Sequence, residues 1–185
     1  MTAEKIEVEV TRTYVQMTSP SELDAQRVDD ADVRVEQVID CPASFYRYLY
    51  CEVGRLYHWV DRTVWSDDET RVHLSRPEIT LWVLYRRGAP AGYFELERHE
   101  DGSTEVAYFG LLQEAIGRGL GKHLLTEAVE RAWAMGAARV WLHTCTLDDP
   151  AALPNYLKRG FKEFKQEKYT TTMSSEERQE GKWVK

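Results

Sequence analysis

Three glycines, Gly117, Gly119 and Gly121, alternate between a segment typical of a strand and a segment typical of a helix. Residues 105–109 before them are rich in valine and aromatic side chains, which favour strands. From Leu120 onward, the apolar residues recur at helical spacing. A helix that begins in glycines presents bare backbone N–H groups and the positive end of its dipole. The stretch therefore predicts an anion site, for which phosphate is the usual ligand.

Two basic side chains, Arg118 and Lys122, lie within the same stretch and would add positive charge to it. A dinucleotide-binding fold would need Gly-x-Gly-x-x-Gly after its first strand and an acidic residue about twenty positions later. A Walker loop would need Gly-Lys-Ser or Gly-Lys-Thr after four spacer residues. The alternating glycines match neither pattern, so the anion site belongs to another class of protein.

The 185 residues carry a net charge of −7. The length suits one domain with a full core. The acidic excess argues against nucleic acid as a general partner and mildly favours a cationic ligand. No apolar run approaches membrane-spanning length and the N-terminus is polar, so we expect neither a membrane partner nor a signal peptide. The cysteines, Cys41, Cys51 and Cys145, form no pair or cluster with zinc spacing, which predicts reduced thiols, no metal and a cytoplasmic location.

The order of the predicted elements indicates the fold class. We expect strands over 5–17, 33–39, 78–86, 91–98, from 105 to the glycines, 139–146 and 161–169. We expect helices over 42–53, within 63–73, from 120 to 136 and over 149–159. Three strands joined by tight turns precede the glycines. The pattern predicts one α+β domain over residues 1–170, followed by a polar, mobile tail over residues 171–185.

The stretch from Ile116 to Gly121 resembles the phosphate-binding loop of the GNAT superfamily of N-acetyltransferases. The signature of that family, Gln/Arg-x-x-Gly-x-Gly/Ala, lies between a central strand and a helix, as the glycines do here. Ile116 occupies the position where the family usually has Gln or Arg. This departure removes one polar phosphate contact, which Arg118 and Lys122 could partly replace.

A second family motif, Asn-x-x-Ala-x-x-x-Tyr-x-x-x-Gly-Phe, is matched downstream by Ala152, Tyr156, Gly160 and Phe161. Two motifs in the family's order are a far more specific signal than one. The resemblance covers residues 81–169. Asp149 replaces the Asn of this motif, which puts one contact to pantetheine in doubt.

The resemblance implies an α+β fold with a mixed, mostly antiparallel central sheet of six or seven strands, flanked by helices and splayed into a V at the central strands. It also implies transfer of an acetyl group from the co-substrate acetyl-CoA to a primary amine in a ternary complex. We expect the acceptor to be a small molecule. Homodimers are common in the family. A protein lysine or N-terminus as the acceptor, and a non-catalytic CoA-binding module, are the alternatives.

By the same resemblance, the backbone of the glycine stretch would hold the CoA pyrophosphate. The preceding strand would align the pantetheine arm where it splits from its neighbour, and Gly110 there fits either a bulge or a close backbone approach. The Leu111 N–H would polarise the thioester carbonyl. The expected cofactor-binding residues are Phe109, Gly110, Leu111, Leu112, Gly117, Arg118, Gly119, Leu120, Gly121, Lys122 and Asp149.

Two residues take the expected catalytic roles. Glu105 lies where some family members have a general base, and the alternative is an exposed charge on a strand. Glu95 and Glu97, on the neighbouring strand, are its rivals, and alternation puts both on one face. Tyr156 matches the general-acid tyrosine of the family, and the alternative is a core tyrosine.

Aromatic side chains are candidates for the wall of an acceptor pocket, although aromatics usually pack in a core first. The candidates are Tyr57, Trp59, Trp65, Trp82 and Tyr93, of which Tyr57, Trp59, Trp82 and Tyr93 are the expected substrate-binding residues. Cys145 and His143 share a strand face and could form an acyl-cysteine site. A buried structural cysteine is the stronger interpretation.

Overall fold

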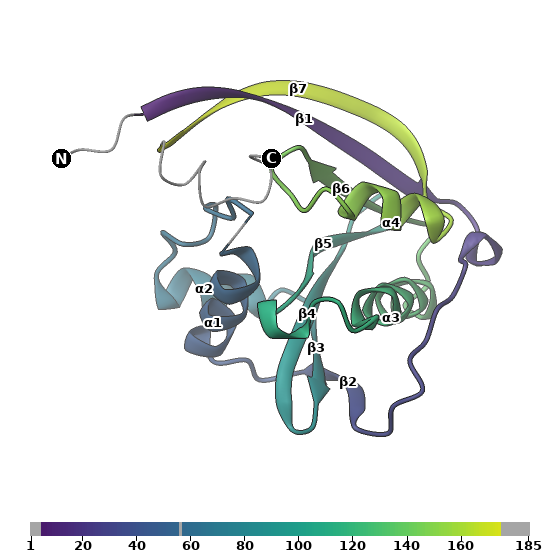
Figure 1. Cartoon of the computed structure of the whole chain (residues 1–185). Coiled ribbons are helices and arrows are strands. Elements are labelled where there is room, and N and C mark those ends of the chain that lie inside the picture. Colours follow the sequence, from purple (N-terminus) through teal and green to yellow (C-terminus); the bar gives the residue numbers. More distant parts are fainter. Residues whose placement is uncertain (1–4, 56, 175–185) are drawn as a thin grey trace.

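A computed structural model describes residues 5–55 and 57–174, which form one sheet of seven strands in the order β2-β3-β4-β5-β6-β1-β7 (Figure 1). The strands are β1 (Lys5–Met17), β2 (Val33–Val38), β3 (Ile79–Arg86), β4 (Ala89–Arg98), β5 (Ser103–Leu111), β6 (Arg139–Cys145) and β7 (Lys162–Ser174). The helices are α1 (Ala43–Gly54), α2 (Asp67–Leu74), α3 (Leu120–Ala134) and α4 (Ala152–Lys158), with 3₁₀ turns at Pro20–Glu22 and Gln113–Ala115. The predicted α+β class is confirmed.

Helices cover both faces of the sheet (Figure 1). On one face, Leu124 and Leu125 of α3 are fully buried against Phe94 and Leu96. On the other face, α1 buries a second cluster of apolar side chains against β3 and β4. Alternate residues of β4 supply the two clusters, as expected for a strand that is covered on both sides. No helix in the described part of the chain is long and apolar enough to cross a bilayer.

The sheet opens into a V between β5 and β6, as the resemblance implied. These are the neighbouring strands that run parallel, and they pair only at Ser103–Arg139, Thr104–Val140 and Glu105–Trp141. Beyond Glu105 the strands diverge, although β5 continues to Leu111. The second half of β5 therefore has one edge bound to β4 and one edge that no described strand covers.

The bulge in β5 lies at Ala107 and not at Gly110, so a bulge, the first of the two possibilities for Gly110, is not found. The β4–β5 register shifts between the pairs Glu95–Tyr108 and Leu96–Val106, so that Ala107 has no partner. A bulge inserts one residue and reverses the alternation of the side chains after it. It explains why Tyr108 packs with the α1 cluster whereas Val106 packs with the α3 cluster.

Gly110 permits a close approach between elements instead. A Cβ atom at this position would collide with a methyl group of Val53 in α1. Helix α1 can therefore pack directly on β5 because residue 110 has no side chain. The close approach that the sequence suggested is present, with a helix as the neighbour.

The C-terminal strand is longer than expected. Residues 171–174, predicted to begin a mobile tail, belong to β7 and pair with the first residues of β1 as far as Lys5–Ser174. Their polar sequence concealed the strand: Met173 is buried beside Val10 and Leu147, whereas Thr171 and Thr172 are not buried. Residues 175–185 lie outside the described residues. The β1–β7 pair forms a long curved ribbon along one side of the molecule (Figure 1).

Candidate active site

A cavity of about 740 Å³ opens where β5 and β6 diverge. Its walls come from β5, β6, α4, the loop before α3, the segment after α1 and the β1–β7 ribbon. Twelve of the residues that the sequence proposed for the site line it: Tyr57, Trp59, Glu105, Phe109, Gly110, Leu111, Gly117, Gly119, Gly121, Lys122, Asp149 and Tyr156. Segments that are far apart in the sequence therefore meet in one cleft.

One end of the cleft is the N-terminus of α3. Gly117 and Gly119 have φ values of +80° and +75°, a left-handed conformation that favours glycine. Gly119 is the N-cap of α3 and no side chain caps the helix, so its first N–H groups stay available to a ligand. Lys122 adds positive charge, and Ile116 is 37% exposed at the edge of the cleft. This geometry suits a phosphate group.

The free edge of β5 forms the middle of the cleft. The N–H of Leu112 donates a hydrogen bond to the Ala91 carbonyl at 2.9 Å, so residue 112 faces β4. Because backbone groups alternate in direction along a strand, the N–H of Leu111 faces away from β4 and into the V. It is the position from which a backbone donor could reach an extended ligand beside β5.

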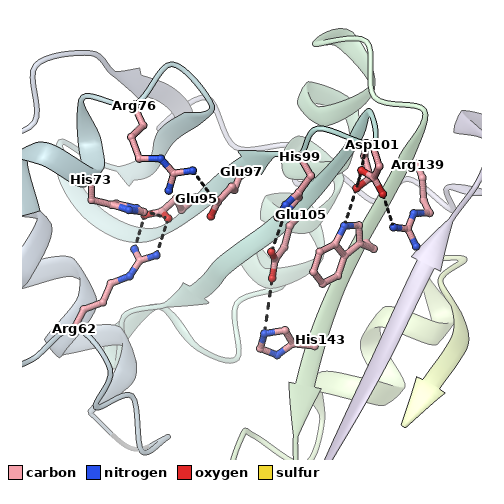
Figure 2. Close-up of polar contacts among 12 residues, drawn as sticks. Arg62, His73, Arg76, Glu95, Glu97, His99, Asp101, Glu105, Arg139 and His143 are labelled. Carbon is pink, nitrogen blue, oxygen red and sulfur yellow. Dashed lines mark hydrogen bonds and ion pairs between the residues drawn. The ribbon is translucent and has the colours of Figure 1, made fainter. Parts of the chain in front are cut away.

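Glu105 lies at the fork of the V, with a side chain that is only 13% exposed. Figure 2 shows its carboxylate between two imidazoles: His99 Nε2 is 3.1 Å from Oε2, and His143 Nε2 is 3.7 Å from Oε1. Burial raises the pKa of Glu105, the hydrogen bond from His99 opposes this, and the charges of Glu97 and Glu95 add to it. A carboxylate with a raised pKa is a better proton acceptor near neutral pH.

His143 also lines the cleft, on β6. Burial, followed by the nearby charge of Arg12, lowers the pKa of His143 to about 4. Its ring is therefore neutral at pH 7, and its contact with Glu105 is a polar contact rather than an ion pair. A neutral imidazole can accept a proton or donate one, according to its tautomer.

The rivals of Glu105 are engaged elsewhere (Figure 2). Glu95 is fully buried, with Arg62 at 2.8 and 3.0 Å, His73 at 2.9 Å and the Tyr46 hydroxyl at 2.8 Å. Its carboxylate does not line the cleft. Glu97 does line it, directly opposite Glu105 on β4, but Arg76 binds its carboxylate at 2.8 Å. Glu105 is thus the best placed of the three to act as a base.

Tyr156 lies on α4, which begins at Ala152 rather than at residue 149 as the sequence predicted. Its ring is 7% exposed and packs edge-on against Phe109 and Phe161, while the residue lines the cleft. Burial raises the pKa of Tyr156, and the charge of Asp148 adds to this effect. The phenol therefore stays protonated at neutral pH and can act as a proton donor.

Two of the expected substrate-binding aromatics lie away from the cleft. Trp82 stacks on Phe94 beneath α3, with the Arg131 guanidinium 4.4 Å from its ring centroid. Tyr93 is fully buried in the α1 cluster. Trp65, a weaker candidate, packs on His73 and Arg62. Aromatic character alone could not tell which face of each strand is open. Trp59 lines the cleft and also packs against the backbone of Gly54.

Three expected cofactor-binding side chains are also placed elsewhere. Leu112 is buried in the α1 cluster, and Leu120, the first residue of α3, is 2% exposed in the core. The Arg118 Nε donates to the Glu114 carbonyl at 3.2 Å, and its side chain lines a separate surface depression. Backbone atoms of the glycine stretch can still face the cleft, but these side chains do not.

Two further residues, Asp148 and Cys145, line the cleft. Asp148, which was not among the candidates from the sequence, accepts hydrogen bonds from the Thr144 hydroxyl at 2.7 Å and the Cys145 N–H at 2.9 Å inside the cleft. Burial raises the pKa of Cys145 to about 11, so the thiol is protonated and poorly suited to an acyl-cysteine. Asp149 accepts from the Ala151 N–H at 3.0 Å. No three His, Cys, Asp or Glu side chains gather as a metal site within 5–55 and 57–174.

Comparisons with known proteins agree with this architecture. A family model described as the acetyltransferase (GNAT) family matches residues 43–161. No curated protein matches the chain. Among solved structures, a GCN5-related N-acetyltransferase from Kribbella flavida has a TM-score of 0.62 and 20% identity, covering 92% of this chain and 59% of that one.

Two further structures share the fold. A GCN5-related N-acetyltransferase from Sphaerobacter thermophilus has a TM-score of 0.66 and 14% identity over 89% of this chain and 51% of its own. An aminoglycoside acetyltransferase from an uncultured soil metagenomic sample has a TM-score of 0.55 and 17% identity over 72% of this chain and 93% of its own. The present chain thus spans between half and three-fifths of the length of the two GCN5-related proteins.

Proposed function

The chain belongs to the GNAT acetyltransferase family, and on this premise we propose that it transfers an acetyl group from acetyl-CoA to a primary amine of a small molecule. Direct attack of the amine in a ternary complex is the proposed mechanism. The observation that carries the proposal is the position of Glu105, an ionisable and largely buried carboxylate at the fork of the V. It lies in the same cleft as the phosphate-type loop.

Acetyl-CoA would supply the acetyl group as an activated thioester. The backbone N–H groups at the start of α3, together with Lys122, would hold the pyrophosphate. The free edge of β5 would bind the pantetheine arm in the way that another strand would. The aromatic rings of Phe109 and Tyr156, which meet in the wall of the cleft, exclude water from the reacting end.

Proton movements follow from the residues around the V. Glu105 accepts a proton from the substrate ammonium, directly or through one water, which frees the nitrogen lone pair for attack on the thioester carbonyl. The Leu111 N–H stabilises the negative charge that develops on the carbonyl oxygen. The new C–N bond replaces the C–S bond, and Tyr156 donates a proton to the departing thiolate. The second proton that the nitrogen loses as the amide forms returns, through water, to the Tyr156 phenolate. Each step uses a residue that lines the cleft.

The test combines acetyl-CoA with a panel of small primary amines and, separately, with a peptide library that contains free lysines and N-termini. Thiol release and the mass of the N-acetyl product are measured together. We expect a small-molecule product. If only peptides were acetylated, the acceptor would be a protein lysine or N-terminus. Tight CoA binding by calorimetry without product from either panel would make the chain a non-catalytic CoA-binding module.

A further inference from the structure

Arg12, on β1, lines the cleft, and no carboxylate of the described residues forms an ion pair with it. Its guanidinium lies 5.0 Å from the ring centroid of Tyr169 on β7. Its Nε is buried and has no hydrogen-bond partner among the described residues. The acid opposite it on β7 is Glu167, whose carboxylate is bound by the Tyr14 hydroxyl at 2.7 Å and Lys165 at 2.5 Å. The Tyr14 and Tyr169 side chains and the more distant charge of Glu167 surround the Arg12 guanidinium, but no carboxylate of the described residues binds it directly.

Arg62, which also lines the cleft, differs from Arg12 in having a carboxylate partner. Arg62 is 9% exposed and binds both oxygens of Glu95. Its charge is fully compensated and serves to hold the segment after α1 against the sheet. Arg12 has no such carboxylate among the described residues. Burial lowers the pKa of Arg12, but the Tyr14 and Tyr169 side chains favour its charged form and raise the pKa overall, so its charge stays available to an anionic ligand.

The geometry relates Arg12 to the proposed base. On the β1–β6 ladder, Arg12 pairs with Cys145 and Tyr14 pairs with His143. Arg12 and His143 are thus diagonal neighbours, with Cα atoms about 7–8 Å apart, on the same face of the sheet. His143 in turn lies 3.7 Å from Glu105. The His143 imidazole therefore lies between the Glu105 carboxylate, which would receive the amine, and the Arg12 guanidinium.

We infer that Arg12 binds a carboxylate carried by the acceptor, which makes the acceptor an amino acid or a similarly small amine with a carboxylate. This inference rests on the proposed function. An acceptor can place its amine at Glu105 and its carboxylate at Arg12 when only a few bonds separate these two groups of the acceptor. A guanidinium presents its N–H donors in a planar fork that matches a carboxylate. The Tyr169 ring holds this fork in place.

The experiment uses matched triplets of acceptors: α-amino acids, their primary amides and the corresponding decarboxylated amines. Wild-type protein is compared with Arg12→Gln and with Arg12→Lys, which keeps the charge but not the fork. Arg34→Gln is the matched control, because Arg34 also lies on a strand, over the Tyr85 ring at 5.3 Å, but on β2 and away from the cleft. Acetyl-CoA affinity is measured for every protein.

We expect the wild-type protein to prefer the amino acid over its amide by about 10- to 100-fold in kcat/KM. Arg12→Gln should lose this preference mainly through a higher KM, Arg12→Lys should retain part of it, and Arg34→Gln should retain all of it. Unchanged affinity for acetyl-CoA would show that Arg12 serves the acceptor. Equal use of acid and amide, or a preference for the decarboxylated amine, would overturn the inference while leaving acetyl transfer intact.

A second readout separates the inference from the proposed function. If none of the triplets is acetylated, binding of the amino acids and amides to the CoA-loaded protein is measured by calorimetry. Amino acid binding that Arg12→Gln abolishes and Arg34→Gln retains would support the Arg12 site although acetyl transfer had failed. Binding that does not distinguish the acid from the amide would overturn the site.

Discussion

At the scale of single residues, opposing effects set the pKa of Glu105. Burial and the facing carboxylates raise its pKa, whereas the hydrogen bond from His99 lowers it. The balance leaves a carboxylate that is more basic than a surface glutamate. The sequence could nominate Glu105 from its spacing to the glycines. It could not show the two imidazoles beside it, because His99 and His143 arrive from a turn and from another strand.

Glu105→Gln removes the base without changing the size of the side chain. We expect kcat/KM to fall by about a hundredfold or more. In the wild type, activity should rise with pH as Glu105 loses its proton, at a pH above the ordinary value of 4.5, and this limb should be absent in the variant. A pH–rate profile measures both effects.

The stability of the same variant gives an independent control. A carboxyl group with a raised pKa in the folded state binds more protons folded than unfolded, so its contribution to stability falls as pH rises above 4.5. At pH 7 the Gln variant should therefore unfold at a temperature no lower than wild type. A clear loss of stability together with an unchanged pH–rate profile would make Glu105 a structural residue.

Tyr156→Phe tests the proton donor. The ring packs against Phe109 and Phe161, and phenylalanine retains that packing. We expect kcat to fall by about tenfold or more, while the affinity for acetyl-CoA stays within about twofold of wild type. Steady-state kinetics and calorimetry measure the two quantities. Wild-type turnover in the variant would show that Tyr156 is a core residue and not the proton donor.

At the scale of elements, the N-terminus of α3 carries the anion site. Gly119→Glu places a side chain and a negative charge at the N-cap, where the Cβ itself meets only Val28 at 3.9 Å. Gly88→Glu, in the β3–β4 turn, is the matched control, because Gly88 also has a positive φ, of +83°, and open space around it. Both variants carry a similar backbone penalty of about 1–2 kcal/mol.

We expect Gly119→Glu to weaken acetyl-CoA binding by at least about a hundredfold, because a carboxylate would repel the phosphates and fill the loop. Gly88→Glu should bind acetyl-CoA as the wild type does. Calorimetry measures both affinities. Wild-type affinity in a folded Gly119→Glu variant would remove the phosphate site from this loop.

The packing of α1 on β5 can be tested through Gly110. A Cβ at this position would collide with Val53, so Gly110→Ala should destabilise the protein by about 1–3 kcal/mol. Adding Val53→Ala to Gly110→Ala should recover part of the loss, relative to Val53→Ala alone. Chemical denaturation of the single and double variants measures the coupling. Additive effects would show that the two residues do not oppose each other.

Element positions were largely predictable, because alternation and helical spacing are local properties of the sequence. The predicted strand over 5–17 coincides with β1, and the predicted strand and helix on either side of the glycines correspond to β5 and α3. The face that a side chain takes was not predictable. Trp82 and Tyr93 lie in the core, and the bulge at Ala107 reverses the alternation within β5. Which layer covers each face depends on residues distant in the chain.

At the scale of the whole molecule, the site exists because β5 and β6 diverge and other parts of the chain enclose the gap. Arg62, bound to Glu95, holds the segment after α1 on one side of the cleft. The β1–β7 ribbon brings Arg12 and Tyr169 to it from both ends of the sequence. Such long-range pairing leaves no local trace, so Arg12 was absent from the sequence-based candidates and residues 171–174 were predicted as tail.

A crystal structure with acetyl-CoA bound tests the central claim most directly. We expect the pyrophosphate to lie against the backbone N–H groups from Gly117 to Lys122. The thioester carbonyl should lie within hydrogen-bond distance of the Leu111 N–H, with the Glu105 carboxylate facing the acetyl group from the acceptor side. Acetyl-CoA bound outside the V, or bound in it with its thioester remote from Leu111 and Glu105, would contradict the account.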